Sequence, residues 1–343
     1  MSSLTIAALK GQAGEIPLLA VVIAQLQSRA AKETKTGKPY LELSFADSTG
    51  SFLLKIWSDS PVFAFAADLP DAEIVRLEAK WLQNSYGIDA RELAFHRPDD
   101  AALEDFFAGD PLLKARQEKD FAEIVRLVGT IGDPRLLALC ERFLDQMGAR
   151  FRRTAAARRN HHARRGGLVE HVASMMRSAD ALCVVYPDLN RDLLLTGVLF
   201  HDCGKLWENS YAEHGFSQSS TFAGEMLGHI PLGIECVNFH WREIMDSEAA
   251  AAWATLQPPA ETTRLHLLHL VGSHHGEFQF GSPVLPRTPE AFALHHIDNL
   301  DAKLEMVREA YATANQSSPG IYERVFPLPA NLVAPLPLLT DPS

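Results

Sequence analysis

The stretch LLLTGVLFHDCGK, residues 193–205, decides the fold class of the second half of the chain. Its first eight residues have the composition of an apolar helix, and the polar pair His201-Asp202 follows directly. Gly204 then allows the helix to stop. Unpaired, either polar side chain would cost several kcal/mol in an apolar setting, and a bound metal ion would satisfy both. The stretch therefore predicts a metal site at a helix end.

Helical periodicity surrounds this stretch, with apolar residues at spacings of three and four up to about residue 316. The segment GLVEHVASMM, residues 167–176, places His171 on one of these helices. We predict an all-helical domain over residues 150–316, preceded by a helical connector over residues 98–149. Residues 317–343 contain six prolines and are predicted to form an extended arm or a flexible end.

The first 97 residues show the shorter, alternating pattern of β-strands. In TKTGKPYLELSFADSTGSFLLKIW, residues 34–57, two alternating runs flank a turn at 47–50, which predicts a hairpin. The stretch resembles the first three strands of an OB-fold, a small barrel that commonly binds single strands through aromatic and cationic side chains. The candidate contacts are Tyr40, Phe52, Lys55 and Trp57, beside a basic turn with Lys32, Lys35 and Lys38. Alternatively, half of these side chains fill the barrel interior.

The histidines are concentrated in the helical half. Thirteen of the fourteen lie between His161 and His296, and three adjacent His-His pairs occur where composition alone predicts fewer than one. Imidazoles together with carboxylates suit divalent transition metals. We therefore expect one metal centre built from residues that are distant in sequence.

His171, the HDCGK motif after a gap of 29 residues, and the aspartate of HHIDNLDAK, residues 295–303, resemble the HD superfamily of metal-dependent phosphohydrolases. The resemblance implies an all-helical bundle over about 150–315. It also implies a first metal site formed by His171, His201, Asp202 and Asp298. By the same resemblance, His229, His274 and His275 would hold a second ion, which Asp202 would bridge; alternatively, one of His274 and His275 orients a ligand instead of binding the ion. His269 and His295 are candidates to orient ligands.

A narrower resemblance covers residues 16–315. The hairpin motif, NHHARRGGLVEH (160–171), the HDCGK motif and the segment from SHHGEF to HHIDNLDAK (273–303) occur in the order found in YhaM-type exoribonucleases. That family joins an OB-fold to an HD domain. A departure is the run RFRRTAAARRNHHARR, with seven arginines between residues 150 and 165. It is either a solvated face or a phosphate contact, and the candidate substrate contacts within it are His162, Arg164 and Arg165.

The resemblance implies a metal-dependent 3′-5′ exonuclease that hydrolyses single-stranded RNA, and also single-stranded DNA, by metal-activated water. Two ions are expected, Mn²⁺ first, with Co²⁺, Fe²⁺, Mg²⁺ or Zn²⁺ as alternatives. Asp202 is expected to act in catalysis, and Lys205 to neutralise charge on phosphoryl oxygens. The alternatives are a phosphohydrolase of nucleotides or cyclic dinucleotides with the barrel as an interaction module, and a nucleic-acid-binding adaptor.

Composition restricts the cellular location of the protein and the way in which it could bind nucleic acid. A net charge of -11 argues against coating nucleic acid through the overall field, although a local basic groove remains compatible with it. The apolar stretch at residues 16–26 lacks the flanks of a signal peptide, and no apolar run is long enough to span a membrane. The four separated cysteines fit reduced thiols. We expect a cytoplasmic protein, either monomeric or a homo-oligomer.

Overall fold

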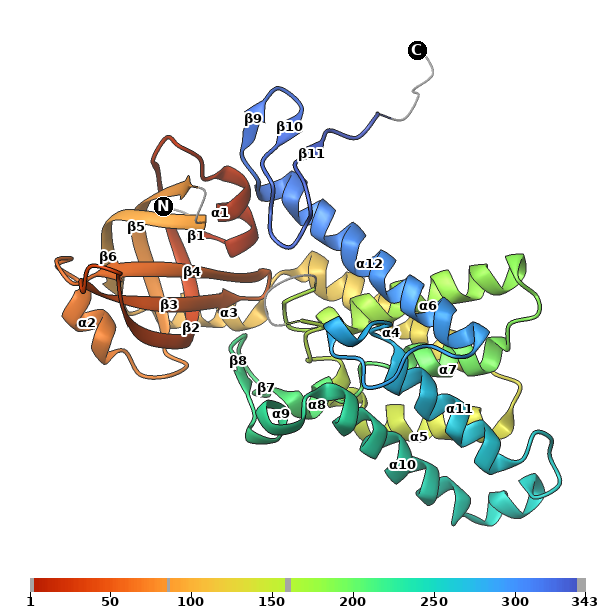
Figure 1. Ribbon diagram of the computed structural model, residues 1–343. Coiled ribbons are helices and arrows are strands. Elements are labelled where there is room, and N and C mark those ends of the chain that lie inside the picture. Colours follow the sequence, from red (N-terminus) through yellow and green to blue (C-terminus); the bar gives the residue numbers. More distant parts are fainter. Residues whose placement is uncertain (1–2, 85–86, 158–161, 338–343) are drawn as a thin grey trace. The chain divides into compact units, whose positions relative to one another are not determined.

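The computed structural model describes residues 3–84, 87–157 and 162–337, and the chain divides into two compact units (Figure 1). The first unit comprises residues 1–45, 52–99 and 303–343, and the second comprises residues 46–51 and 100–302. The domain boundaries predicted at residues 97, 149 and 316 separate parts of different function, whereas this division is one of compactness. These boundaries therefore stay predictions.

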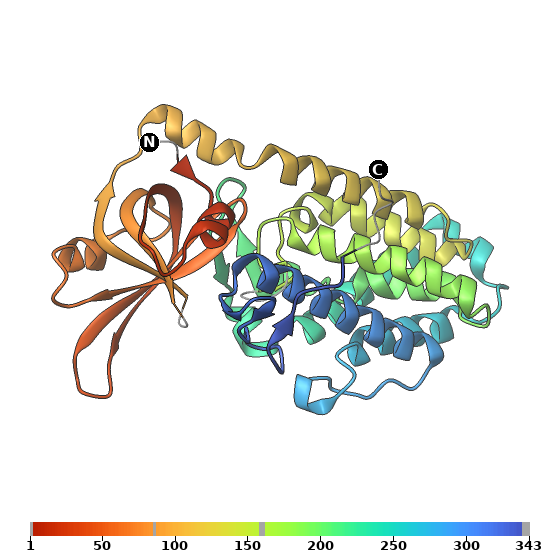
Figure 2. The same cartoon turned by 90° about the horizontal axis from the view of Figure 1, so that it is seen from above.

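The first unit contains a five-stranded sheet with the strand order of an OB-fold. Its strands are β2 (Leu18–Glu33), β3 (Pro39–Asp47), β4 (Gly50–Trp57), β5 (Ile74–Asn84) and β6 (Gly87–His96). They lie in the order β4-β3-β2-β5-β6, and α2 (Phe63–Asp68) connects β4 to β5. Figure 2 shows these strands curling around a common interior. The predicted OB-type architecture is confirmed by this strand order.

The alternation of residues along β4 decides which side chains face inward. Phe52, Leu54 and Ile56 are buried in the core of the sheet, whereas Lys55 and Trp57 lie on the outer face. Successive side chains of a strand point to opposite faces. The proposal of Phe52 as a nucleic-acid contact is therefore wrong, because this ring packs against Phe45 and Trp81 inside the unit.

The ends of the chain add smaller elements to the first unit. Near the N-terminus, β1 (Ser3–Leu4) pairs with β2, and α1 (Ile6–Gln12) is capped by Thr5, whose hydroxyl accepts a hydrogen bond from the amide of Ala8. Near the other end, β9 (Gln316–Ser318), β10 (Ile321–Tyr322) and β11 (Leu332–Val333) form a three-stranded sheet. The prediction of an extended or flexible tail is wrong for these residues, because their backbone groups pair with one another.

The second unit is mainly helical. Its longer helices are α4 (Pro111–Val128), α5 (Pro134–Phe151), α6 (Gly167–Val185), α7 (Arg191–Phe200), α10 (His229–Met245), α11 (Ala260–Ser273) and most of α12 (Pro289–Thr313). Shorter elements are α3 (Asp100–Ala108), α8 (Lys205–Glu208), α9 (Phe222–Leu227) and the 3-10 turns η1 (Glu248–Trp253) and η2 (Phe278–Phe280). Asp110 and Asp133 cap α4 and α5, and each precedes a proline at the first helical position. The predicted helical bundle is confirmed.

The core of this unit surrounds α7. All residues of α7 from Leu193 to Phe200 are buried, and α5, α6 and α11 pack around it. A helix that is apolar on all sides requires such a central position. The expectation of a purely helical domain needs one correction, because β7 (Asn209–Tyr211) and β8 (Gln218–Ser220) form a hairpin. Its polar sequence has no helical period, and Gly215 adopts a φ of +97° between the strands.

In the part of the chain that the structure describes, no helix is long and apolar enough to cross a membrane.

Candidate metal centre

Five segments of the helical unit bring the predicted ligands together. His171 lies in α6, the His201-Asp202 pair follows α7, and His229 is the first residue of α10. The remaining three are His274 and His275, directly after α11, and Asp298 in α12. All seven donate side chains to one cluster, in which His171, His201, Asp202 and His274 are buried.

One part of the cluster is built on His171 and His201. Their Nε2 atoms lie 3.3 Å apart, and Nε2 of His171 lies 3.3 Å from Oδ1 of Asp298. Nε2 of His201 lies 3.3 Å from Oδ2 of Asp202. Two donor atoms that each lie about 2.1 Å from one ion are separated by about 3.0–3.4 Å. These separations therefore fit the ligand shell of a single metal ion.

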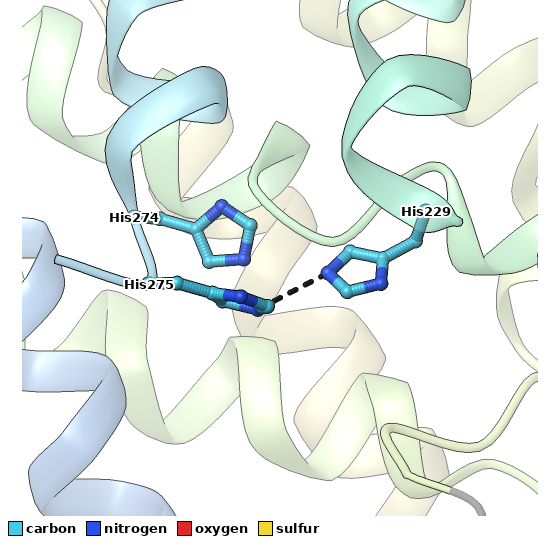
Figure 3. A group of neighbouring side chains, drawn as sticks. All are labelled: His229, His274 and His275. Carbon is cyan, nitrogen blue, oxygen red and sulfur yellow. Dashed lines mark hydrogen bonds between the residues drawn. The ribbon is translucent and has the colours of Figure 1, made fainter. Parts of the chain in front are cut away.

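The other part is a group of three histidines (Figure 3). Nε2 of His229 lies 3.2 Å from Nε2 of His275, and the rings of His274 and His275 lie edge to face with their centroids 4.4 Å apart. One donor atom from each of the three rings falls within 4.8 Å of the other two. This spacing is compatible with a second ion.

Asp202 lies between the two parts and directs one oxygen to each. Its Oδ2 faces His201, whereas its Oδ1 lies 3.5 Å from Nε2 of His229 and 3.7 Å from Nε2 of His274. Within the described part of the chain, Oδ1 of Asp202 and Nε2 of His274 are both buried without a hydrogen-bond partner. Buried polar atoms without partners are costly in an apolar interior, and a cation between them would remove this cost.

Hydrogen bonds on the far sides of the rings fix the tautomers of three histidines. Nδ1 of His201 lies 2.8 Å from the carbonyl of Val198, Nδ1 of His274 lies 2.8 Å from that of Val271, and Nδ1 of His275 lies 2.7 Å from that of Phe280. A carbonyl only accepts, so each Nδ1 carries the proton and donates it. Each Nε2 is then left with a lone pair directed into the cluster, as metal binding requires.

Asp301 orients His171 and was not identified from the sequence. Its Oδ2 lies 2.7 Å from Nδ1 of His171 and 3.2 Å from Nε2 of His162. Asp301 follows Asp298 by three residues on α12, so both carboxylates lie on one helix face. That spacing was a usable signal in the sequence. Carboxylates that hold the non-ligating nitrogen of a histidine raise its basicity as a ligand.

The charges in the cluster stabilise one another. Burial alone would raise the pKa of Asp202, but Lys205 and His201 hold it well below its usual value. Burial lowers the pKa of His171, yet hydrogen bonds to Asp298 and Asp301 raise it to about 9. Burial and the neighbouring His201 hold the pKa of His274 well below its usual value. A carboxylate that stays ionised beside a neutral imidazole is the donor set of a divalent metal site.

Gly204 brings two of these segments together. A Cβ atom at this position would lie only 1.8 Å from the carbonyl oxygen of His229, so α10 starts directly against the HDCGK turn. Gly204 has a φ of -63°, which any residue can adopt. The predicted role of Gly204 as a conformational stop is therefore wrong, because the position requires the absence of a side chain. This close approach places His229 beside Asp202.

Lys205 lies at the edge of the cluster. Its Nζ lies 2.6 Å from Oδ2 of Asp202 and donates a hydrogen bond to the carbonyl of Ala156. The side chain is mostly buried, with 12% of its surface exposed. The structure thus places the lysine beside the metal ligands, where its ammonium group contacts Asp202. Its predicted contact with phosphoryl oxygens stays a prediction.

The candidate substrate contacts near residue 165 have different surroundings. His162 is buried and reaches Asp301. Arg164 makes a two-pronged ion pair with the buried Glu170, and Arg165 donates to the backbone carbonyls of three residues of the β7-β8 loop, Ala212, Glu213 and Gly215. Arg158 and Arg159, also in the predicted arginine run, lie outside the described residues.

His269 and His295 do not contact the ligand rings through their own rings. Nε2 of His269 accepts a hydrogen bond from the backbone amide of Arg287. Nδ1 of His295 lies 2.9 Å from the carbonyl of His274, which is the backbone of a ligand position. Of the two candidates for orienting ligands, only His295 is thus placed to hold the segment that carries them.

The outer face of β3 and β4 carries the three remaining candidates. The rings of Tyr40 and Trp57 lie with centroids 5.2 Å apart, and Nζ of Lys55 lies 6.0 Å from the centroid of Tyr40. Trp57 exposes 40% of its surface. Paired aromatic rings with a nearby cation form the kind of surface on which unpaired bases stack.

Residues 168–303 match the HD domain family, a range that contains every predicted metal ligand. The 3′-5′ exoribonuclease YhaM of a Geobacillus species is 34% identical over 295 residues, which cover 85% of this chain and 84% of that protein. This chain belongs to the YhaM family. The YhaM protein of Bacillus velezensis is likewise 34% identical over 299 residues, covering 85% of this chain and 87% of that protein.

Among solved structures, the second OB-fold domain of replication protein A from Methanococcus maripaludis aligns with 29% of this YhaM-family chain and 98% of its own. The TM-score is 0.21 and the identity is 15%. The OB-type fold of the present chain rests on its own strand order.

The family membership and the cluster agree about the chemistry of the site. YhaM relatives are HD-domain hydrolases, and this chain is an enzyme of that class. Its histidines and aspartates form a donor set that suits a divalent metal ion, with buried oxygen and nitrogen atoms that lack partners at the centre.

Proposed function

We propose that this YhaM-family enzyme is a metal-dependent exonuclease that removes nucleotides from the 3′ end of single-stranded RNA. The observation that carries the proposal is the placement of Asp202, whose two oxygens face two separate groups of histidines. A carboxylate placed in this way could be shared by two ions, and two-metal phosphodiesterases use such an ion pair to stabilise both the attacking and the leaving oxygen. The names of the relatives, 3′-5′ exoribonucleases, supply the substrate and the polarity.

We assign seven side chains to two divalent ions, with Mn²⁺ as the first candidate. His171, His201 and Asp298 would hold one ion, His229, His274 and His275 the other, and Asp202 both. When bound, such ions supply a water molecule of lowered pKa and neutralise charge on the phosphoryl oxygens. The protein's own contribution is to fix the donor atoms in advance through the backbone carbonyls and Asp301.

The reaction is hydrolysis of the last phosphodiester bond. The oxygen of water bonds to phosphorus, and the bond from phosphorus to the 3′ oxygen of the preceding nucleotide breaks. That oxygen takes up a proton and becomes the new 3′ hydroxyl, so a nucleoside 5′-monophosphate is released. Lys205, which contacts Asp202 at 2.6 Å, is close enough to the centre to stabilise the negative charge of the transition state.

The OB-type unit would hold the strand. Tyr40 and Trp57 on its outer face present aromatic surface for unpaired bases, and Lys55 adds a positive charge. Stacking of a base on an aromatic ring contributes about 1–3 kcal/mol and does not depend on base identity. The unit is therefore proposed to prefer single strands without selecting a sequence.

The proposal is tested with RNA labelled at the 3′ end, compared with a double-stranded RNA, single-stranded DNA, mononucleotides and a cyclic dinucleotide. With Mn²⁺, the enzyme should release labelled mononucleotide from the single strand from the first turnover. His201→Gln should abolish release, whereas His296→Gln, at the exposed second position of another His-His pair, should leave it unchanged. Preferential hydrolysis of the cyclic dinucleotide would instead establish a small-molecule phosphohydrolase.

A further inference from the structure

The helical unit contains a cavity of about 520 Å³ whose wall is rich in cationic side chains. Lys114 and Gln117 of α4 contribute to it, as do Arg152 and Arg153 after α5. Arg165, before α6, and the loop between β7 and β8 also line the cavity. None of the seven proposed metal ligands lines this cavity. Its volume falls within the range of about 300–1,000 Å³ that is usual for small-molecule sites.

The acids of the wall leave part of its positive charge uncompensated. Glu118 is paired with Arg152, and Asp110 caps the first turn of α4. Glu213, the third acid, is exposed and holds Arg165 through its backbone carbonyl. Within residues 3–84, 87–157 and 162–337, Lys114 and Arg153 make no ion pair with a carboxylate.

Arg153 is the least satisfied of these cations. Among the residues that the structure describes, its Nε atom is buried without a hydrogen-bond partner, and its guanidinium otherwise reaches only the carbonyl of Ala149, at 3.5 Å. A buried donor that lacks an acceptor costs about 1–3 kcal/mol, and more when the group is charged. An acceptor supplied by a ligand would remove this cost.

Arg165 presents a guanidinium whose position is already fixed. Three backbone carbonyls of the β7-β8 loop accept hydrogen bonds from its Nη1 and Nη2 atoms, and its guanidinium lies 6.0 Å from the ring centroid of Tyr211. Burial and the neighbouring charge of Arg153 lower the pKa of Arg165. Burial and Arg153 also lower the pKa of Arg150. The charge of Arg153 therefore acts unfavourably on both Arg150 and Arg165, and an anion beside Arg153 would relieve this repulsion.

We propose that this cavity is a phosphate-binding site, separate from the metal centre, that takes a phosphate group of a nucleic-acid strand or of a free mononucleotide. Arg153 and Lys114 would contact the phosphate oxygens, and Arg165 would contribute its charge from a fixed position. The strand as the source of the phosphate rests on the proposed nuclease function. The mononucleotide as the source would make the cavity a site for the reaction product.

The test measures binding in EDTA, so that no hydrolysis occurs and the result does not depend on the proposed activity. Fluorescence anisotropy reports the affinity for a labelled single-stranded RNA of twelve nucleotides, and calorimetry reports binding of AMP and of inorganic phosphate. The variants are Arg153→Gln and Lys114→Gln. The matched control is Arg126→Gln, also on α4, because Arg126 is paired with Glu123 and does not line the cavity.

If the phosphate belongs to a strand, Arg153→Gln should weaken RNA binding about tenfold, the effect of losing one charged hydrogen bond. The slope of log K against log salt should become shallower by about 0.7. If it belongs to a free nucleotide, the wild type should bind AMP or inorganic phosphate, and Arg153→Gln should lose this binding. Lys114 is exposed, so Lys114→Gln should weaken binding of the same ligand without lowering the unfolding temperature.

Either pattern supports the site, and the pair of ligands tells the two sources apart. The proposal is overturned if both variants bind RNA as the wild type does and the wild type binds neither AMP nor phosphate. It is also overturned if Arg126→Gln weakens RNA binding as much as Arg153→Gln does. If the wild-type enzyme releases no nucleotides but Arg153→Gln still weakens ligand binding, the nuclease function is refuted and the phosphate-binding site is supported.

Discussion

Replacement of Gly204 by alanine tests how the fold positions the metal centre. The new Cβ would lie 1.8 Å from the carbonyl oxygen of His229 and 2.6 Å from the amide nitrogen of Gly233. Both neighbours are backbone atoms, which cannot move aside by changing a rotamer. Because Cβ contacts below 3.0 Å are essentially never found, the start of α10 must shift by at least about 1.2 Å.

Two effects of opposite sign determine the stability of Gly204→Ala. The φ of -63° and ψ of -19° suit alanine, so the loss of glycine flexibility should stabilise the fold by about 0.5–1 kcal/mol. Overpacking in a rigid core costs about 1–3 kcal/mol, and a clash between backbone groups belongs at the upper end. We expect a net loss of about 2 kcal/mol. For a unit of this size that corresponds to a fall of about 4–8 °C in Tm.

Activity should fall further than stability does. A displacement of about 1 Å at a catalytic centre can reduce a rate about 100-fold, and His229 would move by that amount. Thermal unfolding and nucleotide release should be measured on the same preparation. The control is Gly148→Ala in α5, whose new Cβ would meet only the ring of Phe121 at 3.8 Å, and which should be neutral or stabilising. A Gly204→Ala enzyme with unchanged Tm and full activity would refute the reasoning.

Three further outcomes follow from contacts in the helical unit. Asp301→Asn should reduce metal affinity about 10–100-fold in a metal titration, because the amide supports the wrong tautomer of His171; unchanged affinity would argue against that role. Removal of metal by EDTA should abolish nucleotide release and lower Tm, and Mn²⁺ at 100 times its Kd should restore about 2.7 kcal/mol of stability, whereas release that persists in EDTA would contradict metal dependence. Burial alone would raise the pKa of Asp133, but its ion pair with the buried Arg135 holds it below its usual value. This stabilisation should be complete above about pH 4 and lost as pH falls through the folded pKa. Asp133→Asn, which keeps a helix cap, should therefore lower the free energy of unfolding by urea at pH 7, and this loss should shrink as pH falls through the folded pKa of Asp133; a loss that is the same at every pH would rule out the ion pair as its cause.

The helical half could be predicted largely from the sequence, because local signals carry the main information. The apolar period places His171 on a helix, and the change from eight mostly apolar residues to His201-Asp202 marks a polar site at a buried helix end. Asp301 was within reach of the same reasoning, since it shares a helix face with Asp298. In the sheet, the phase of Phe52 with Leu54 and Ile56 was sufficient to place that ring inside.

Other features depend on tertiary contacts that the sequence does not encode locally. The pairing of Arg164 with Glu170 forms across the start of α6, where Gln117 from α4 also binds this carboxylate. Proline content indicated an extended tail, yet short strands pair there despite the prolines. The role of Gly204 depends on which segment packs against it, and that segment begins 24 residues later, at Gly228 and His229.

Asp202 is the ligand that both proposed ions would share, and the metal content of the purified enzyme tests this assignment most directly. After equilibration with Mn²⁺ and removal of free ions, mass spectrometry should find about two ions per chain in the wild type and in His296→Gln. Asp202→Asn should retain fewer than about one, because both groups of histidines lose the same charged ligand. A wild type with less than about one ion per chain, or an Asp202→Asn enzyme with unchanged metal content, would contradict the account.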